Sequence, residues 1–405
     1  MVPGVRALIR PRFLLAAAVA GVAAGLIGIA MALLLELFES LFYGVTHGGL
    51  LERLAAAPPW RRALAPALGG LVAGGLWWWL RATGGVSDVE TTVADRSGQA
   101  APRMGLARPF LDAVTQVLTV GAGNSVGREG APRLAAGAGL AAMYNAPLGG
   151  AAYAVELVMV AGMRRRGALV AVPVCLIATL VSWLHSHGRP TFEVASPGLS
   201  SGTALGLVLL VPVAAAVGVA ARRLWSWMLA HRVRAPQWLP AAIGTAGLVT
   251  GLVSLSVPAV VGNGRDAMET ALGTGLPGAT NSAAGAGLVL LVGIVALKPV
   301  LTGLTLAAGA TGGRLAPSLA AGSSAGAALA IALHTCGVEA SVPVLAIAGA
   351  GAVLATTQRA PVFGIIFTWE LARAGAWTLV ALLAVVVAVT LLTSPAWRLR
   401  TSESR

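Results

Sequence analysis

Two glycine-led segments contain residue types that favour the binding of an anion. They are Gly127-Arg-Glu-Gly130 and Gly312-Gly-Arg-Leu315, and each precedes an apolar run. An ion that enters a medium of low dielectric constant loses solvation worth on the order of 20 kcal/mol. The first turn of a helix replaces part of this through unpaired N–H groups and about half a positive charge, and glycine allows close approach. Two such helix ends aimed at one point predict an anion site. For a single segment, the alternative is glycine that serves only helix packing.

Glu129 places a carboxylate directly beside the first of these predicted helix ends. A carboxylate within a membrane costs about 2 to 3.5 kcal/mol on insertion scales, so such a residue usually has a function or a charged partner. In this position it can fill the anion's place as a tethered substitute. Protonation then releases it, which links anion occupancy to pH. The alternative is a structural ion pair with Arg128 or Arg133.

The elements that carry these segments are predicted to lie in a membrane. The chain has 405 residues, of which 57% are hydrophobic and only 11% charged, and its mean hydropathy is +0.82. A soluble domain carries about 25% charged residues. Residues 13–35 contain no charge and exceed the roughly 20 residues that span a hydrocarbon core. Shorter apolar runs that begin at glycine and proline are typical of broken half-helices. We therefore predict an all-α polytopic membrane protein.

The charge pattern predicts an orientation and argues against nucleic acid as a partner. The formal net charge is +13, and arginines gather at residues 6–12, 164–166, 222–234 and 398–405. By the positive-inside tendency these clusters face the cytoplasm, so both termini are predicted to be cytoplasmic and the chain to sit in the plasma membrane. The sequence has no basic stripe interleaved with aromatic residues, which excludes the usual nucleic-acid surfaces. The expected partners are the lipid bilayer and small anions.

An internal repeat divides the chain into two halves. Residues 145–157 (NAPLGGAAYAVEL) recur as residues 359–371 (RAPVFGIIFTWEL), and residues 127–132 match residues 312–317 in the same order. Paired motifs of this kind are typical of inverted-topology repeats around a site at the bilayer midplane. The predicted boundaries are a first repeat at 1–185, a connecting loop at 186–201, a second repeat at 202–397 and a tail at 398–405.

The two halves differ in length. Pro132 and Pro147 are 15 residues apart, whereas the matching Pro317 and Pro361 are 44 residues apart. The first half is therefore shorter by about one helical hairpin. Either the chain dispenses with helices between residues 132 and 147, or the sequence is defective at that point.

The motifs and their order resemble the CLC family of chloride channels and chloride/proton exchangers, in its short form. Gly127-Arg-Glu-Gly130 is similar to the family's G-[K/R]-E-G-P, and Gly312-Gly-Arg-Leu-Ala-Pro317 to its G-x-F-x-P, within a resemblance that covers about residues 14–397. The resemblance implies an α-helical homodimer with one pore per subunit, in which Glu129 is the external gating glutamate. The anion-binding positions that it implies are Gly84, Arg128, Gly130, Arg314, Leu315 and Trp397.

Three positions depart from the family pattern. Gly84 replaces the serine whose oxygen helps to hold the central anion, and Trp397 aligns with an anion-contacting tyrosine. The internal proton-transfer glutamate of the exchangers falls at Leu157, which cannot carry a proton. Adjacent residues on a helix point about 100° apart, so Glu156 is a poor replacement. We therefore expect channel-like or weakly proton-coupled chloride movement. Glu156 and Glu370 recur at matching repeat positions near helix ends, and we expect both to be structural.

Other functions stay open at this point. Within transport they are a fluoride-handling relative, which typically has methionine at the position of Gly84, a chloride/proton antiporter, and a nontransporting relative. A membrane-embedded enzyme needs a nucleophile with a base, or a metal triad, inside the spans, and the sequence offers neither. His185 and His187 have no third ligand near them in sequence, so no metal and no cofactor is expected.

Overall fold

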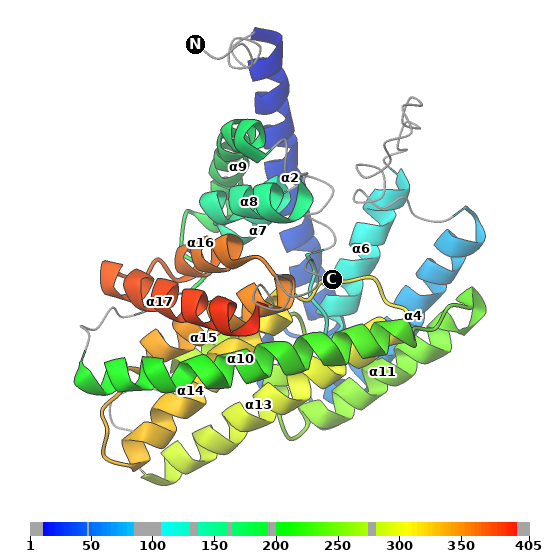
Figure 1. Ribbon diagram of the computed structural model, residues 1–405. Coiled ribbons are helices and arrows are strands. Elements are labelled where there is room, and N and C mark those ends of the chain that lie inside the picture. Colours follow the sequence, from blue (N-terminus) through cyan, green and yellow to red (C-terminus); the bar gives the residue numbers. More distant parts are fainter. Residues whose placement is uncertain are drawn as a thin grey trace, which may run out of the picture.

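The computed structural model is built from helices throughout the part of the chain that it describes, which is residues 11–46, 48–84, 107–129, 137–159, 164–192, 194, 200–273 and 281–394 (Figure 1). The helices of the first half are α2 (Pro11–Tyr43), α3 (Leu50–Ala56), α4 (Pro59–Ala82), α6 (Ala107–Gly121), α7 (Ala138–Tyr144), α8 (Pro147–Tyr153), the π-helix η2 (Ala154–Val158) and α9 (Arg164–Ser186). Those of the second half are α10 (Ser201–Ala230), η4 (Pro236–Trp238), α11 (Leu239–Ser254), η5 (Pro258–Val260), α12 (Arg265–Gly273), α13 (Asn281–Ala307), α14 (Leu315–Thr335), α15 (Val342–Gln358), α16 (Pro361–Ala372) and α17 (Ala376–Thr393).

Seven of the described helices are long and apolar enough to cross a membrane. They lie in α2, α4, α9, α10, α13, α14 and α17. Helices α15 and α16 are apolar but shorter, as expected for elements that enter a bilayer without spanning it. Large apolar side chains are exposed along α2, α10 and α17, where lipid rather than protein can cover them. The predicted all-α polytopic membrane fold is confirmed.

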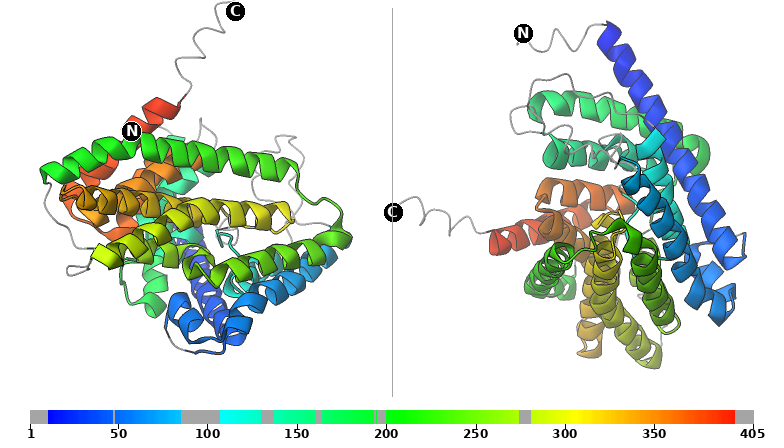
Figure 2. Two further views of the ribbon diagram at one scale, coloured as in Figure 1. Left: turned by 90° about the horizontal axis from the view of Figure 1, so that it is seen from below. Right: turned by 90° about the vertical axis from the view of Figure 1, so that its right-hand side faces the viewer.

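The helices pack in two groups around a buried centre. In the first half, α9, α7 and α6 contact α2, and α8 packs against α9. In the second half, α14 packs between α13 and α15, and α10 contacts all three of these helices (Figure 1, Figure 2). The pairs α4 with α11 and α8 with α16 join the two groups. Helix α14 is thus the most enclosed span, with 89% of its most apolar window buried.

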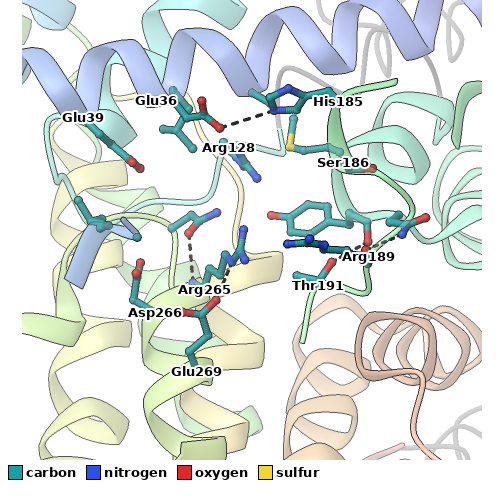
Figure 3. Close-up of a pocket in the computed structure, with 18 of the residues that line it drawn as sticks. Glu36, Glu39, Arg128, His185, Ser186, Arg189, Thr191, Arg265, Asp266 and Glu269 are labelled. Atoms are coloured by element: carbon teal, nitrogen blue, oxygen red, sulfur yellow. Dashed lines mark hydrogen bonds and ion pairs between the residues drawn. The ribbon is translucent and has the colours of Figure 1, made fainter. Parts of the chain in front are cut away.

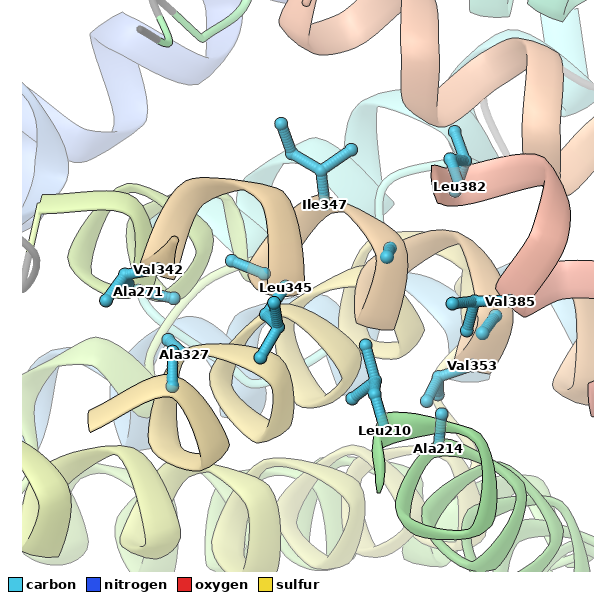
Figure 4. Packing of buried hydrophobic residues seen from close by; sticks show 14 of the residues in the cluster. Leu210, Ala214, Ala271, Ala327, Val342, Leu345, Ile347, Val353, Leu382 and Val385 are labelled. Atoms are coloured by element: carbon cyan, nitrogen blue, oxygen red, sulfur yellow. The ribbon is translucent and has the colours of Figure 1, made fainter. Parts of the chain in front are cut away.

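Glycine lets α14 and α15 approach each other closely. A Cβ atom on Gly322 would collide with the carbonyl oxygen of Gly349, and a Cβ atom on Gly349 with that of Gly322. Around this contact, Ala327 of α14 and Leu345 of α15 belong to a cluster that also includes Leu210 of α10 (Figure 4). In a membrane such close packing is a main source of helix association, because lipid is as apolar as the side chains.

The repeated segments of the two halves contact each other reciprocally. Glu370 of α16 accepts hydrogen bonds from the backbone N–H groups of Leu148 (3.1 Å) and Gly149 (2.6 Å) at the start of α8. Glu156, at the matching position after α8, accepts them from Val362 (3.4 Å) and Phe363 (2.6 Å) at the start of α16. Each half therefore caps a helix of the other half. The expectation that both glutamates are structural residues near helix ends agrees with these contacts.

The backbone pairing of the two glycine-led motifs differs by one residue from their alignment in the sequence. Gly127 and Gly313 form an isolated antiparallel bridge, so Gly127 faces Gly313 and not Gly312. The turns before them correspond in the same register, since Gly123 (φ 99°) and Gly309 (φ 109°) both have left-handed backbone conformations. The sequence alignment matched Pro132 with Pro317. In the register of the bridge, the first motif has one more residue before its proline than the second, which explains the difference.

Candidate functional site

The first motif lies in a loop that begins where α6 ends and is held by three other elements. The Tyr43 hydroxyl of α2 donates to the carbonyl of Ala122 (2.9 Å), and the Asn124 side-chain amide donates to the carbonyl of Pro66 in α4 (2.8 Å). The N–H of Gly262, which follows α11 and η5, donates to the carbonyl of Gly123 (3.1 Å). These buried bonds fix the approach of the loop to the second half.

The two glycine-led motifs meet at the bridge between Gly127 and Gly313. The N–H of Gly127 donates to the carbonyl of Gly313 (2.9 Å), and the N–H of Gly313 donates to the carbonyl of Gly127 (2.8 Å). The described ends of the two segments, which come from opposite halves of the chain, are therefore in direct backbone contact.

The carboxylate of Glu129 occupies the N-terminus of α14. Its side chain is buried, with 2% of the residue exposed, and Oε1 accepts a hydrogen bond from the backbone N–H of Ala316 (2.8 Å). A Cβ atom on Gly127 or Gly313 would overlap this carboxylate, so glycine makes room for it at both positions. The first N–H groups of a helix have no partner within the helix and favour an anion. Glu129 thus fills the place that a small free anion would take.

Only some of the other predicted anion-binding positions lie near Glu129. Leu315 is the first residue of α14 and is buried, and Arg314 is its N-cap residue and is partly exposed. Arg128 is buried, and its guanidinium lies over the ring of Tyr144, 5.6 Å from the ring centre. Gly130 and Trp397 lie outside the described residues.

Gly84 lies after the end of α4, with φ +136°, and is exposed. Its nearest neighbours there are the guanidinium atoms of Arg108, which donates hydrogen bonds to the carbonyls of Leu80 and Thr83. The structure thus brings together Arg128, Glu129, Arg314 and Leu315. Gly84 lies instead near the carbonyl groups at the C-terminal end of α4.

The second motif opens a long helix, α14, as predicted. After Glu129 the described chain resumes at Gly137 and enters α7, which is 7 residues long, whereas α14 has 21. The expectation that the first motif also opens an apolar half-helix falls on residues 130–136, which lie outside the described residues.

Lys298 supports the same region from α13. It is the only lysine in the chain and is fully buried. Its Nζ donates to the carbonyls of Val260 (2.8 Å), Val261 (3.2 Å) and Gly262 (2.7 Å) at the end of η5. An ammonium group has three donors, and here all three bind carbonyl oxygens. Its charge also acts on Glu129 and Asp266.

A polar cavity of about 580 Å³ adjoins Arg128. We call it the vestibule, and Figure 3 shows how α2, α12 and the segment after α9 surround it. Its charged lining residues are Glu36, Glu39, Arg53, Arg128, His185, Arg189, Arg265, Asp266 and Glu269. In the figure, Arg128 lies between the carboxylates of α2 and those of α12. The vestibule therefore leads from the surface toward the loop that carries Glu129.

Most charges of the vestibule are paired. Arg265 Nε lies 2.8 Å from Glu269 Oε1, His185 Nε2 lies 3.6 Å from Glu36 Oε1, and Arg53 Nε lies 3.8 Å from Glu39. Asp266 has no ion pair of this kind among the described residues. Burial, and after it the carboxylate of Glu269, raise the pKa of the Asp266 carboxyl, while Arg265 and Lys298 act in the opposite direction. Asp266 therefore takes up a proton at a higher pH than an exposed aspartate.

Leu157 lies in the π-helix η2 and packs against the apolar cluster that contains Leu140, Tyr153 and Phe363. Its neighbour Glu156 is bound to the first turn of α16. No described carboxylate thus takes the place of a proton-transfer glutamate at Leu157.

Three residues near Glu129 and the vestibule were not predicted from the sequence as parts of the site. They are Ala316, Lys298 and Asp266. Ala316 contributes only its backbone N–H, which any residue but proline provides, so no side-chain signal marks it. Lys298 carries a signal, since a lone lysine in an apolar run is costly unless it has partners. Asp266 stands between an arginine and an alanine, and no motif in the sequence marks it.

Comparison with known proteins gives concordant results. The profile of a family described as voltage gated chloride channel matches residues 133–393. A chloride channel protein, ClcB-like, from Ralstonia nicotianae is 30% identical over 397 residues, which cover 86% of this chain and 87% of the relative.

Solved structures resemble the chain over nearly its whole length. A slow cyanobacterial Cl⁻/H⁺ antiporter superposes with a TM-score of 0.73 at 22% identity, covering 95% of this chain and 94% of that one. A CLC-type fluoride/proton antiporter superposes with a TM-score of 0.69 at 18% identity, covering 95% and 97%. At these identities the likeness establishes the fold.

Proposed function

The chain belongs to the CLC family of voltage-gated chloride channels, and from this premise we propose that it carries chloride or another small anion across the membrane, with Glu129 as the gate. One observation above all supports the proposal. The Glu129 carboxylate accepts the Ala316 N–H at the first turn of α14, which is a position suited to an anion. A free anion enters this position when the carboxylate leaves it.

Release of the gate follows from protonation. An ionised carboxylate is attracted by the positive end of the α14 dipole, and a neutral one is held more weakly. Acid therefore favours the state in which Glu129 has left and the anion is bound. Since Arg128 and Arg314 flank the position, their charges compensate part of the solvation that the anion loses.

The proposed architecture has two inverted repeats, residues 1–185 and 202–397, joined by the loop at 186–201. Three reciprocal features support it: the antiparallel bridge of Gly127 with Gly313, and the two swapped helix caps of Glu156 and Glu370. Equivalent residues that contact each other across a local two-fold axis produce this pattern. The site then lies where the axis passes between the halves.

The proposed setting is the plasma membrane, with both termini cytoplasmic and two subunits that each contain one path. With the start of α2 inside, its far end and the vestibule face the external solution. Residues 164–166 and 222–234 carry the arginines that support this orientation.

The test is anion efflux from liposomes that contain the purified protein, with the membrane potential clamped. We expect chloride efflux above that of protein-free liposomes, rising as the pH falls. A parallel measurement with fluoride separates a chloride path from a fluoride path, and the proton concentration is recorded in the same experiment. Absence of anion flux at every pH would contradict the proposal and favour a nontransporting relative, for which the short connection after Glu129 would then be the reason.

A further inference from the structure

The vestibule contains two buried carboxylates that the proposed gate does not use. Glu39 of α2 and Asp266 of α12 both line the cavity, with 9% and 6% of each residue exposed. They are far apart in sequence, yet they line the same cavity, and the charge of Asp266 acts on Glu39. Figure 3 shows both carboxyl groups on the same side of the cavity.

The cations near these carboxylates are largely committed to other groups. Lys298 donates its three N–H groups to carbonyl oxygens, and Arg265 forms an ion pair with Glu269. Arg53 approaches Glu39 only to 3.8 Å, since its donors bind Ser40 (2.6 Å) and several backbone carbonyls. Two neighbouring buried carboxylates with weak compensation resist being ionised together.

Arg128 is a buried cation of this cavity that keeps a donor for an anion. It is nine-tenths buried and lines the vestibule, and its Nε has no hydrogen-bond partner among the described residues. Its guanidinium rests over Tyr144 and interacts electrostatically with Glu39. A buried guanidinium favours a counter-charge. That charge comes either from the ionised carboxylates of the cavity or from a mobile anion.

We infer that Glu39 and Asp266 form a second proton-binding site, separate from Glu129, whose charge controls the access of anions to Arg128. When the pair is ionised, its negative charge faces Arg128 and repels an incoming anion. When the pair is protonated, Arg128 attracts the anion and the next step is the displacement of Glu129. The inference rests on the proposed function, because it assigns a regulatory role to the approach to that gate.

The charged groups that face the pair come from every surrounding element. Glu39 faces Arg53 of α3, Arg128 of the loop and Glu36 of its own helix. Asp266 faces Lys298 of α13 and, on its own helix, Arg265 and Glu269. Among these groups, Glu36 and Glu269 are exposed and paired at the rim, so their protonation changes the field at Arg128 less.

The test uses the Glu129→Gln background, in which the gate no longer titrates. Chloride efflux is measured between about pH 7.5 and about pH 5, a range that brackets raised carboxyl pKa values. We expect acid activation to persist there at roughly tenfold, the order of magnitude of one charge that acts across a half-buried site. Adding Glu39→Gln and Asp266→Asn should raise efflux at neutral pH to the acid level and abolish the remaining pH dependence. This gain of flux cannot result from misfolding.

Glu269→Gln in the same background is the matched control and should keep the acid activation. The inference is overturned if Glu129→Gln alone already removes all pH dependence, or if the added variants leave it unchanged. Chloride affinity measured by calorimetry in detergent at the two pH values gives a second readout that does not need transport. If the wild-type protein shows no efflux, the proposed function fails, while the pH dependence of binding still decides the role of Glu39 and Asp266.

Discussion

At the scale of single residues, Glu129 is held by an interaction that a small anion can replace. Its Oε1 accepts the Ala316 N–H at 2.8 Å, and the carboxylate fits only because positions 127 and 313 are glycine. A chloride ion at the same place would accept the same N–H and feel the same helix end. Under the proposed function the side chain therefore competes with the anion for this position, and its protonation decides the competition.

Glu129→Gln should increase chloride efflux at neutral pH and weaken its dependence on pH. A glutamine has nearly the shape of the protonated glutamate but no charge at any pH, so the variant resembles the acid state of the wild type. Efflux of the wild-type protein should rise as the pH falls, because acid neutralises the carboxylate. The measurement is liposome efflux over a series of pH values.

The matched control for this variant is Glu36→Gln, which changes an exposed carboxylate paired with His185 at the rim of the vestibule. Its efflux and pH dependence should follow those of the wild type. An unaltered pH profile in Glu129→Gln would remove the gate from the mechanism.

Lys298→Met should lower the thermal stability strongly. The substitution keeps the approximate length of the side chain but leaves the carbonyls of Val260, Val261 and Gly262 without their donor. Hydrogen bonds to a charged group contribute about 1.5–3 kcal/mol each, so we expect a loss of several kcal/mol. Thermal unfolding in detergent measures it. Arg265→Gln, which breaks a surface pair, should cost at most about 1 kcal/mol. Equal losses for the two variants would refute the role of Lys298.

At the scale of the helices, the swapped caps of Glu156 and Glu370 join the halves more specifically than apolar packing does. Each carboxylate binds two N–H groups at the start of a short helix in the other half. Both capped helices begin at the proline of an Ala-Pro pair. Proline suits the first position of a helix because it has no N–H group that would need an acceptor there. The repeat in the sequence therefore encodes an interface between the halves.

Glu370→Ala and Glu156→Ala should each destabilise the protein by about 0.5–2 kcal/mol, because each leaves N–H groups at the start of a helix without their side-chain acceptor. Thermal unfolding in detergent gives the loss, and Glu339→Ala, at an exposed position, is the control. In the double variant, losses that add would mean independent caps, whereas a smaller combined loss would mean that one broken cap already loosens the interface. A variant that unfolds together with the control would contradict the capping role.

The sequence predicted the helical class, the paired motifs and the structural use of Glu156 and Glu370 because these depend on residue type and order. It did not predict the register of Gly127 with Gly313, since one additional residue before Pro132 is visible only in hydrogen bonds. The N–H of Ala316 carries no side-chain signature. Asp266 and Glu39 each lack a motif in the sequence, and only the cavity that α2 and α12 line together relates them.

At the scale of the whole molecule, the unequal halves determine how the path can be built. Among the described residues, α14 provides one long dipole toward the proposed site, and the first half provides the loop with Glu129 and the 7-residue helix α7. In the proposed mechanism, the described groups that favour an anion there are the end of α14 and the charges of Arg128 and Arg314. A site with full positive charges nearby holds an anion more strongly than one made of dipoles alone. Slow release of the anion is the expected consequence.

The last prediction concerns coupling, which needs a proton route from Glu129 to the opposite side. The position of the internal glutamate is Leu157, which lies in an apolar cluster, and Glu156 is fixed on the N–H of Phe363 at 2.6 Å. We therefore expect a chloride gradient to drive chloride efflux without stoichiometric proton movement. A pH indicator inside the liposomes records the protons, and addition of an uncoupler calibrates the signal. Glu129→Gln is the matched comparison, since it removes the gate carboxylate, from which a proton route to the opposite side would have to start. Both proteins should show the same proton trace, and proton pumping by the wild type that is lost in the variant would establish exchange instead.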